Sequence, residues 1–214
     1  MAISLRSDIK PNQKDVLLAR WEKVTFRIYG MLGKDSRTRV GEYVRLAWQV
    51  KNDGLKVHEI SSAIGSIGED FPIDQATDCL RATNCYDGWQ EEIRYFMFRY
   101  EEYLAEKQGM NYRNEQWQKI WMVNASNSIE HILAKSKANE SQRHRLGNLV
   151  LLPPKLNSKL QANAPKDKAD AYRKTGLLIA GEVADLIDEK GWTSKVINDR
   201  ENALIEWATE EWAD

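Results

Sequence analysis

Residues 128–159 constrain the fold more than any other stretch of the chain. Ser128 to Leu133 is a short β-prone run with an acid and a histidine at its middle. After a polar loop, residues 148–152 form a second apolar run with the length of a buried strand. Pro153 and Pro154 end this run, and proline suits the first turn of a helix. The sequence therefore predicts the order strand, loop, strand, helix.

Four polar side chains that can take part in catalysis or metal binding lie on these elements: Glu130, His131, Asn148 and Asn157. A carboxylate and an amide carbonyl are hard oxygen ligands that suit Mg²⁺. A histidine has an unperturbed pKa of about 6.5, which suits a general base near neutral pH. Because adjacent strand residues point to opposite faces, Glu130 and His131 can serve one site only where the strand ends.

Each of these residues also has an ordinary structural explanation. A Glu-His pair on a half-buried strand usually supports the fold. Asn148 follows Gly147 and fits a turn, because Asn tolerates left-handed backbone geometry. Asn157 fits the surface of a helix. The functional hypothesis therefore depends on the order and spacing of the whole set.

The ordered set Glu130-His131, Asn148 and Asn157 resembles the HNH, or ββα-metal, nuclease motif. The resemblance implies that Glu130 and Asn157 bind a divalent metal, Mg²⁺ first and Mn²⁺ as the alternative. It implies that His131 is the general base and that Asn148 orients it. Glu stands at position 130, where the wider family more often has Asp. Cleavage is then expected to rise with pH near 6.5, unless the site shifts the pKa of His131.

A longer resemblance covers more of the chain. Residues 130–133 read Glu-His-Ile-Leu, residues 144–152 read His-Arg-Leu-Gly-Asn-Leu-Val-Leu-Leu, and residues 156–160 read Leu-Asn-Ser-Lys-Leu, with Asn163 and Lys168 downstream. These strings resemble the C-terminal nuclease domain of GmrSD-type restriction endonucleases, which are modification-dependent anti-phage enzymes with phosphorothioate-sensing relatives. The resemblance implies a nuclease that acts on phage or modified DNA.

The same resemblance extends upstream. Segments 20–30 and 94–102 resemble the helical region that precedes the nuclease, and Ala134 stands where the family usually has Pro. Members of the family also carry an N-terminal nucleotide-dependent sensor domain with an Asp-Gly-Gln-Gln-Arg signature, a string that this sequence lacks. The resemblance therefore implies that this chain is the C-terminal part of a longer protein and that the sensor domain is its partner.

Charge is concentrated around the motif. The whole chain has a formal net charge of −1, but residues 131–174 hold ten Lys and Arg against three Asp and Glu. Such a basic segment attracts a phosphate backbone and makes binding salt-sensitive. The alternative is an ordinary solvated helix face. The side chains predicted to contact nucleic acid are Lys155, Lys159, Lys166, Lys168, Arg143, Arg145 and, in the loop, His144.

Apolar residues at helical spacing predict that most of the remaining chain is helical. The predicted helices cover residues 12–33, a stretch after Ser36 with Val40, Tyr43, Val44 and Ala47 on one side, 57–67, 73–83, 89–108, 165–189 and a last stretch from Thr193 or Ser194. We expect a mainly α fold with an embedded ββα-metal element. Residues 1–110 would form a helical domain that links or docks to the missing sensor, and residues 111–214 the nuclease domain.

No apolar run reaches the roughly 20 residues of a membrane span, and the N-terminus lacks a signal-peptide core. Cys79 and Cys85 form no CxxC pair, so neither a zinc site nor a disulfide framework is expected. These features predict a cytoplasmic protein. The predicted activity is metal-dependent nicking or cleavage of DNA in phage restriction. The alternatives are an inactive DNA-binding or regulatory module with the same fold, and an RNase with the same chemistry.

Overall fold

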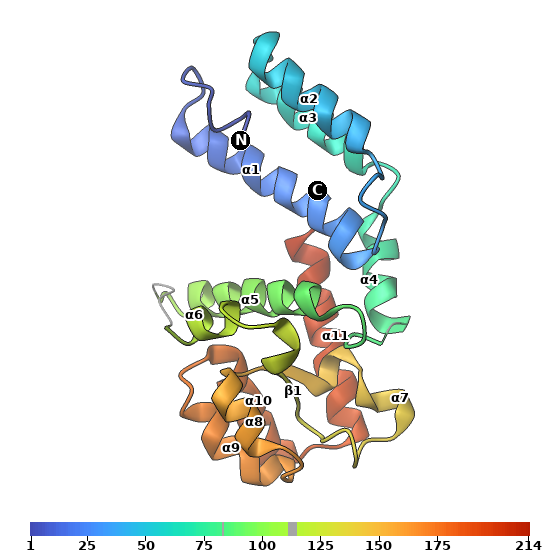
Figure 1. The fold of residues 1–214 in the computed structure, drawn as a ribbon, viewed down its shortest axis with the longest axis vertical. Helices are drawn as coiled ribbons and strands as arrows, with labels where there is room; N and C mark the ends of the chain where they lie inside the picture. Colours follow the sequence, from blue (N-terminus) through green and yellow to red (C-terminus); the bar gives the residue numbers. More distant parts are fainter. Residues whose placement is uncertain (83, 111–114) are drawn as a thin grey trace. The chain divides into compact units, whose positions relative to one another are not determined.

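The computed structural model of the protein describes residues 1–82, 84–110 and 115–214, and these form two compact units (Figure 1). Unit 1 comprises Met1–Ala82 and Ile205–Asp214, and unit 2 comprises Thr83–Leu204. The chain therefore divides at residues 82 and 204 instead of at the predicted residue 110. The reason is that α5 (Gln90–Lys107) packs against α10 (Leu178–Lys190) and β2 (Leu149–Leu151) of unit 2.

Unit 1 is a helical assembly around a small apolar core. Its elements are α1 (Pro11–Thr25), the π-helical η1 (Phe26–Met31), α2 (Val40–Asn52), α3 (Val57–Gly68), α4 (Ile73–Ala82) and the end of α11 (Ser194–Glu211). All were predicted as helices. The predicted apolar side of α2 is only partly correct, because Tyr43 packs against the core while Val40 and Val44 are 47% and 64% exposed. The buried residues of this helix are Leu46 and Val50. The buried residues of α2 join the core of α1 and α3.

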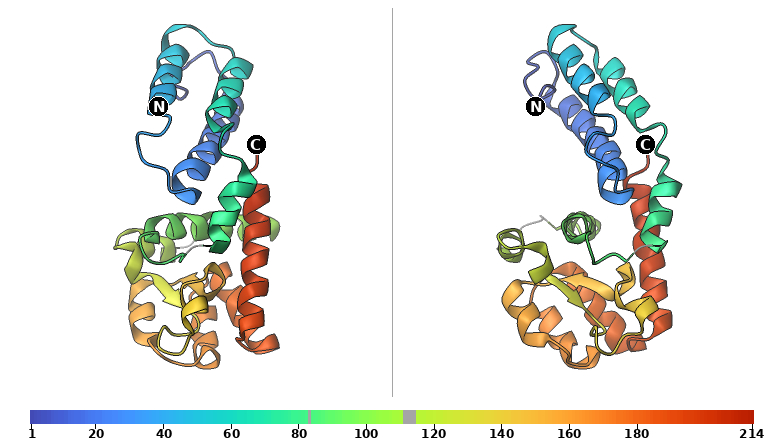
Figure 2. Two further views of the ribbon diagram at one scale, coloured as in Figure 1. Left: turned by 90° about the vertical axis from the view of Figure 1, so that its right-hand side faces the viewer. Right: turned by 45° about the vertical axis from the view of Figure 1, so that its right-hand side comes forward.

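Unit 2 surrounds a two-stranded sheet with helices, as Figures 1 and 2 show. Its elements are α5, α6 (Glu115–Trp121), η2 (Ala125–Asn127), β1 (Ile129–His131), α7 (Glu140–Arg143), η3 (Leu146–Asn148), β2 (Leu149–Leu151), α8 (Pro154–Leu160), α9 (Pro165–Arg173), α10 (Leu178–Lys190) and the first part of α11. Both α5 and α10 contact β2, and every residue of the two strands is buried.

The predicted strand–loop–strand–helix order is confirmed. Strands β1 and β2 are antiparallel, with Glu130 opposite Val150 and His131 opposite Leu149. Helix α8 begins at Pro154, where the missing N–H of proline costs no helical hydrogen bond.

The long helix predicted over residues 165–189 is interrupted. Helix α9 ends at Arg173 and α10 begins at Leu178, and Gly176 between them adopts a φ of +70° that ends a helix readily. The buried Glu101 carboxylate accepts hydrogen bonds from the Leu178 and Ile179 N–H groups, at 2.7 and 2.8 Å. A carboxylate at this position stabilises the start of α10.

Helix α11 supports the turn that leads into β2. The fully buried Arg200 donates from Nη1 to the carbonyl oxygens of Gly147 and Leu149, both at 2.9 Å. An ideal Cβ on Gly147 would lie 2.0 Å from the Ile197 carbonyl oxygen, so only glycine permits this approach. The hairpin is thereby fixed against a helix that begins more than forty residues later in the chain.

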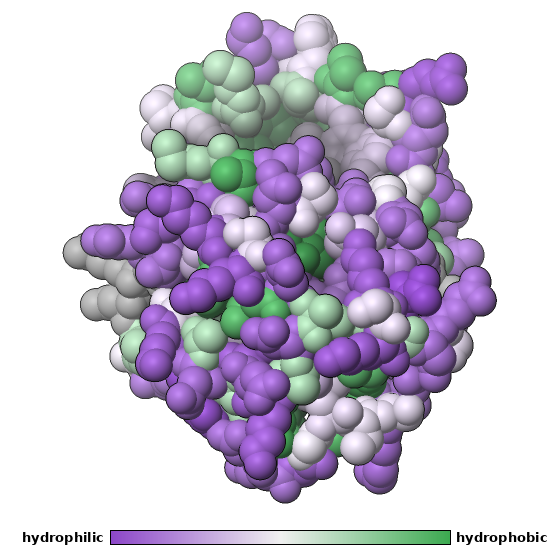
Figure 3. Space-filling view, turned by 60° about the horizontal axis from the view of Figure 1, so that its bottom comes forward, coloured by the Kyte–Doolittle hydropathy of each residue, from purple (hydrophilic) through white to green (hydrophobic). Residues whose placement is uncertain are grey.

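Among the described residues, no helix is both long and apolar enough to cross a membrane. Neither Cys79 nor Cys85 is in a disulfide within that part of the chain. The face that Figure 3 brings forward is covered mostly by hydrophilic residues, with apolar residues in small groups between them.

Candidate active site

His131 closes strand β1 and is 6% exposed. Its Nε2 atom lies 3.0 Å from Nδ1 of His144, which follows α7 in the loop between the strands. The two rings meet edge to face, with centroids 5.1 Å apart. The structure therefore brings together two histidines for which the sequence predicted different roles, a general base for His131 and a phosphate contact for His144.

The segment before α5 packs against both imidazoles. The Tyr86 ring stacks on His144 at 5.2 Å between centroids and meets His131 edge-on at 4.8 Å. Cys85 donates its backbone N–H to the His144 carbonyl oxygen at 2.9 Å. Asp87 Oδ2 lies 4.0 Å from His144 Nε2. Sequence reasoning missed these residues, because no spacing links them to the motif.

Positive groups and burial keep the His131 ring neutral. Burial, as the main cause, together with the charges of Lys135, His144, Lys168 and Arg143, lowers the pKa of His131 to about 3. The pKa of His144 is lowered by burial, while the Asp87 carboxylate opposes this shift. A neutral imidazole has an acceptor nitrogen for a proton, but a pKa this low makes it a weaker base than a histidine whose pKa lies near the working pH.

Asn148 holds the loop that follows β1. Its Oδ1 accepts hydrogen bonds from the Leu133 N–H at 2.9 Å and from Trp192 Nε1 at 3.1 Å. Its Nδ2 donates to the carbonyl oxygens of Leu133 and Arg143, both at 3.1 Å. The predicted orienting residue thus acts on the backbone around His131, and its amide is occupied by these four bonds.

Glu130 lies in a buried ion pair. Lys168 Nζ is 2.5 Å from Glu130 Oε1, and the Tyr172 hydroxyl donates to the same oxygen at 3.2 Å. Lys168 also donates to the carbonyl oxygens of His131 and Ile132. Burial raises the pKa of the Glu130 carboxyl, and Lys168 and Tyr172 oppose this rise. The carboxylate is therefore already neutralised by a protein cation.

Asn157 ties α8 to the start of the hairpin. Its Nδ2 donates to the carbonyl oxygens of Asn127 and Ile129, at 2.9 and 3.2 Å. In the described part of the chain its Oδ1 accepts no hydrogen bond, and no group of three His, Cys, Asp or Glu side chains gathers to hold an ion. Asn157 thus has an oxygen to offer a metal, but the predicted pair does not fit, because Glu130 is bound to Lys168.

A family model described as GmrSD restriction endonucleases, C-terminal domain, matches residues 70–207, well over half of the chain. This chain belongs to that family. The match covers β1, β2, α8 and the Tyr86–Asp87 segment, so all residues of the site described above lie inside it. No curated protein and no solved structure matches the chain. The family is one of restriction nucleases, and DNA is the substrate class that it implies.

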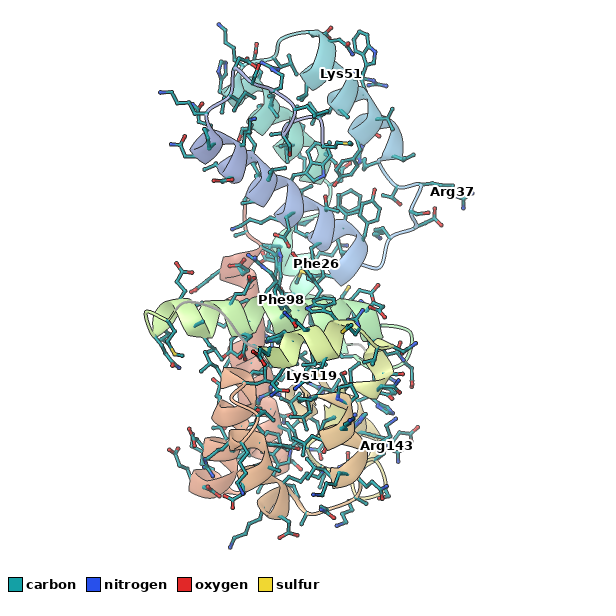
Figure 4. The ribbon with its side chains drawn as sticks, turned by 60° about the vertical axis from the view of Figure 1, so that its left-hand side comes forward. Phe26, Arg37, Lys51, Phe98, Lys119 and Arg143 are labelled. Carbon is teal, nitrogen blue, oxygen red and sulfur yellow. The ribbon has the colours of Figure 1, made fainter. Side chains whose placement is uncertain are left out.

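One of the predicted DNA contacts of this GmrSD C-terminal domain is corrected by the structure. Lys168 is fully buried in the ion pair with Glu130, so it does not reach a phosphate. Arg145 pairs with the buried Glu201, with Nε 2.8 Å from Oε2, but a third of its side chain is exposed and its contact stays a prediction. Arg143 is half-buried at the end of α7 (Figure 4) and remains a predicted contact.

The other predicted basic residues are exposed. Lys166 lies on α9, and Lys155 and Lys159 lie on α8 beside a groove of about 920 Å³. Figure 4 labels Lys119, which lies on α6 and also lines this groove. The remaining lining residues are Gln116, Val123, Pro153, Pro154, Leu156, Asp167, Asp170, Ala171, Lys174 and Thr175. Lys119, Lys155, Lys159 and Lys174 outnumber Asp167 and Asp170 in the lining, so the groove has a positive balance that suits a phosphate backbone.

Proposed function

We propose that this GmrSD C-terminal domain nicks or cleaves DNA at an HNH-type site in which His131 is the general base. The observation that carries the proposal is the nearly buried His131 ring at the end of β1, inside a strand–loop–strand–helix frame and 3.0 Å from the His144 ring nitrogen. Family membership supports the nuclease class and the DNA substrate. A role in phage restriction, with a sensor domain that selects modified DNA, belongs to the same proposal and rests on family membership alone.

His131 would take a proton from a water molecule as that water attacks phosphorus. The new P–O bond forms to the water oxygen, and the bond to the leaving 3′ oxygen of the DNA breaks. Phosphodiester hydrolysis is among the slowest uncatalysed reactions, so charge near the phosphate has a large effect. Lys135 and Arg143, whose charges already lower the pKa of His131, would attract that phosphate.

The divalent ion expected from the resemblance lacks a ready pair of ligands. Asn157 Oδ1 remains a proposed ligand, but Glu130 would bind an ion only after Lys168 released it. Moving Glu130 would leave the Lys168 charge buried without a partner, which is costly. The roles of Mg²⁺ and Mn²⁺ are therefore a separate part of the proposal.

Supercoiled plasmid and a single-stranded RNA of matched length test the activity of the purified chain. Each substrate is incubated with Mg²⁺, with Mn²⁺ and with EDTA. The proposal predicts nicked or linear DNA with a metal present, and intact RNA. Cleavage of RNA alone would support the RNase alternative. Tight DNA binding without cleavage under every condition would support an inactive DNA-binding module.

Cleavage that persists in EDTA would remove the metal from the mechanism and leave His131 as the base. Loss of cleavage in EDTA, with recovery on addition of Mg²⁺ or Mn²⁺, would establish the requirement. The variant Asn157→Ala then tests the ligand, and a binding isotherm for Mn²⁺ that is unchanged in this variant would place the ion elsewhere.

A further inference from the structure

The two imidazoles of the site share one hydrogen bond. His131 Nε2 and His144 Nδ1 are 3.0 Å apart, and a neutral imidazole has one N–H and one acceptor nitrogen. One ring must therefore donate and the other accept. The direction of this bond decides which nitrogen of His131 keeps its lone pair for water.

Asp87 selects the direction. Its Oδ2 lies 4.0 Å from His144 Nε2, and a nearby carboxylate favours the tautomer that carries the proton on the facing nitrogen. His144 Nδ1 is then the acceptor, so His131 Nε2 must carry a proton. The lone pair of His131 is left on Nδ1, which makes no hydrogen bond within the part of the chain that the structure describes.

Neighbouring groups hold this arrangement in place. Asn84 Nδ2 donates to Asp87 Oδ2 at 2.8 Å, and the backbone N–H of Asp87 bonds to Asn84 Oδ1 at 3.1 Å. The Tyr86 ring covers the His144 ring, and the N–H of Cys85 fixes the His144 backbone. His144 is thus positioned from the segment before α5 as well as from its own loop.

We infer that Asp87 and His144 are positioning residues that fix the tautomer of His131, so that Nδ1 is the nitrogen that takes the proton from water. The inference rests on the proposed role of His131 as the base. It replaces the predicted phosphate contact of His144. The Nδ1 atom of His144 faces His131, and its Nε2 atom faces a carboxylate that would repel a phosphate.

The tautomer can be measured without activity. Nitrogen NMR of the full chain, labelled with ¹⁵N in the imidazole rings, distinguishes a protonated ring nitrogen from one with a free lone pair. Assignment to His131 comes from comparison with His131→Ala. The expected result for the unmutated protein is a proton on Nε2 of His131 and none on Nδ1.

Two variants of His144 separate the effect of its accepting nitrogen on His131 from the effect of its ring shape. In His144→Asn the amide oxygen takes the place of the accepting Nδ1, whereas His144→Phe keeps a ring without an acceptor. The Asn variant is expected to keep the His131 tautomer and most of the plasmid nicking. The Phe variant is expected to mix the two tautomers and to nick at least about tenfold more slowly, as incorrect tautomers of catalytic histidines do. Asp87→Asn should also increase the fraction of the wrong tautomer. The control is His58, an exposed residue on α3 of unit 1, and His58→Phe should change neither measurement.

A proton on Nδ1 of His131 in the unmutated protein would overturn the inference, and so would a Phe variant with an unchanged tautomer and rate. Failure of the proposed function gives a different result. In that case His131→Ala would nick at the unmutated rate, whatever the spectra show for the ring nitrogens.

Discussion

At the scale of single residues, the environment of His131 changes the expected pH dependence. The sequence alone predicted that cleavage would rise near pH 6.5 unless the site shifted the pKa of this histidine. The structure shifts it downward to about 3, because the ring is buried among positive groups. A base with a lowered pKa stays unprotonated at lower pH. The acidic limb of the pH–rate profile therefore moves to lower pH.

The pH profile of kcat/KM should therefore be flat between about pH 5 and pH 8, because this parameter reports the pKa of the free enzyme. The measurement is plasmid nicking at low DNA concentration, with DNA binding recorded at each pH. A limb centred near pH 6.5 that is absent from the binding curve would contradict the buried, neutral His131.

The Glu130–Lys168 pair makes a second prediction at this scale. Both side chains are almost fully buried, at 5% and 0% exposed. Removing one partner leaves the other as an uncompensated buried charge, so Glu130→Gln or Lys168→Met should lower the free energy of unfolding by about 3–5 kcal/mol. The free energy of unfolding of the double variant should fall by less than the sum of the two single decreases, because the double variant leaves no buried charge.

Urea unfolding followed by circular dichroism measures all three variants. A metal ligand would behave differently: Glu130→Gln would lose metal affinity and nicking while its unfolding curve stayed in place. That outcome would restore the role predicted from the sequence and show that the ion pair contributes little to the fold.

At the scale of elements, the hairpin and α8 were predictable and their supports were not. Apolar runs and Pro153-Pro154 determine the strands and the helix start locally. The ion pair of Glu130 joins residues 38 positions apart, and the approach of Tyr86 to His131 depends on how α5 packs on the hairpin. Neither has a local pattern, so the sequence could name candidate residues for the chemistry but not the residues that surround them.

Gly147 tests how closely the hairpin must approach α11. Gly147→Ala places a methyl group against the Ile197 carbonyl oxygen, so unfolding free energy should fall by about 2 kcal/mol or more. The matched control is Gly181→Ala in α10, where no described atom outside the neighbouring residues and the backbone of the helix itself lies within 4 Å of the added methyl group. That variant should be stabilised by up to about 1 kcal/mol, because alanine favours a helix. Equal urea midpoints for the two variants would contradict the close approach of Gly147 to the Ile197 carbonyl oxygen.

At the scale of the whole molecule, a formal net charge of −1 coexists with a basic region around the site and the groove. The positive charge is therefore unevenly distributed along the chain, and the groove lysines should determine the salt dependence of DNA binding. Replacing Lys155 and Lys159 by Ala should weaken binding to any DNA sequence. The slope of log K against log salt should fall by about one for each lost phosphate contact.

Fluorescence anisotropy with a labelled duplex at several salt concentrations gives this slope. The exposed lysines Lys190 and Lys195, at the end of α10 and the start of α11, provide the matched double-alanine control. If the control lowers the slope as much as the groove variant does, binding depends on total charge and the groove has no special role.

The most direct test of the central claim is the single-turnover rate of plasmid nicking by His131→Ala, measured beside the unmutated chain and a His58→Ala control. A general base contributes about 10²–10⁴-fold, so the variant should nick at least about a hundredfold more slowly. Its circular dichroism and its affinity for DNA should remain those of the unmutated protein, because the exposed lysines are untouched. A folded His131→Ala protein that binds DNA equally and nicks at a comparable rate would contradict the assignment of His131 as the base.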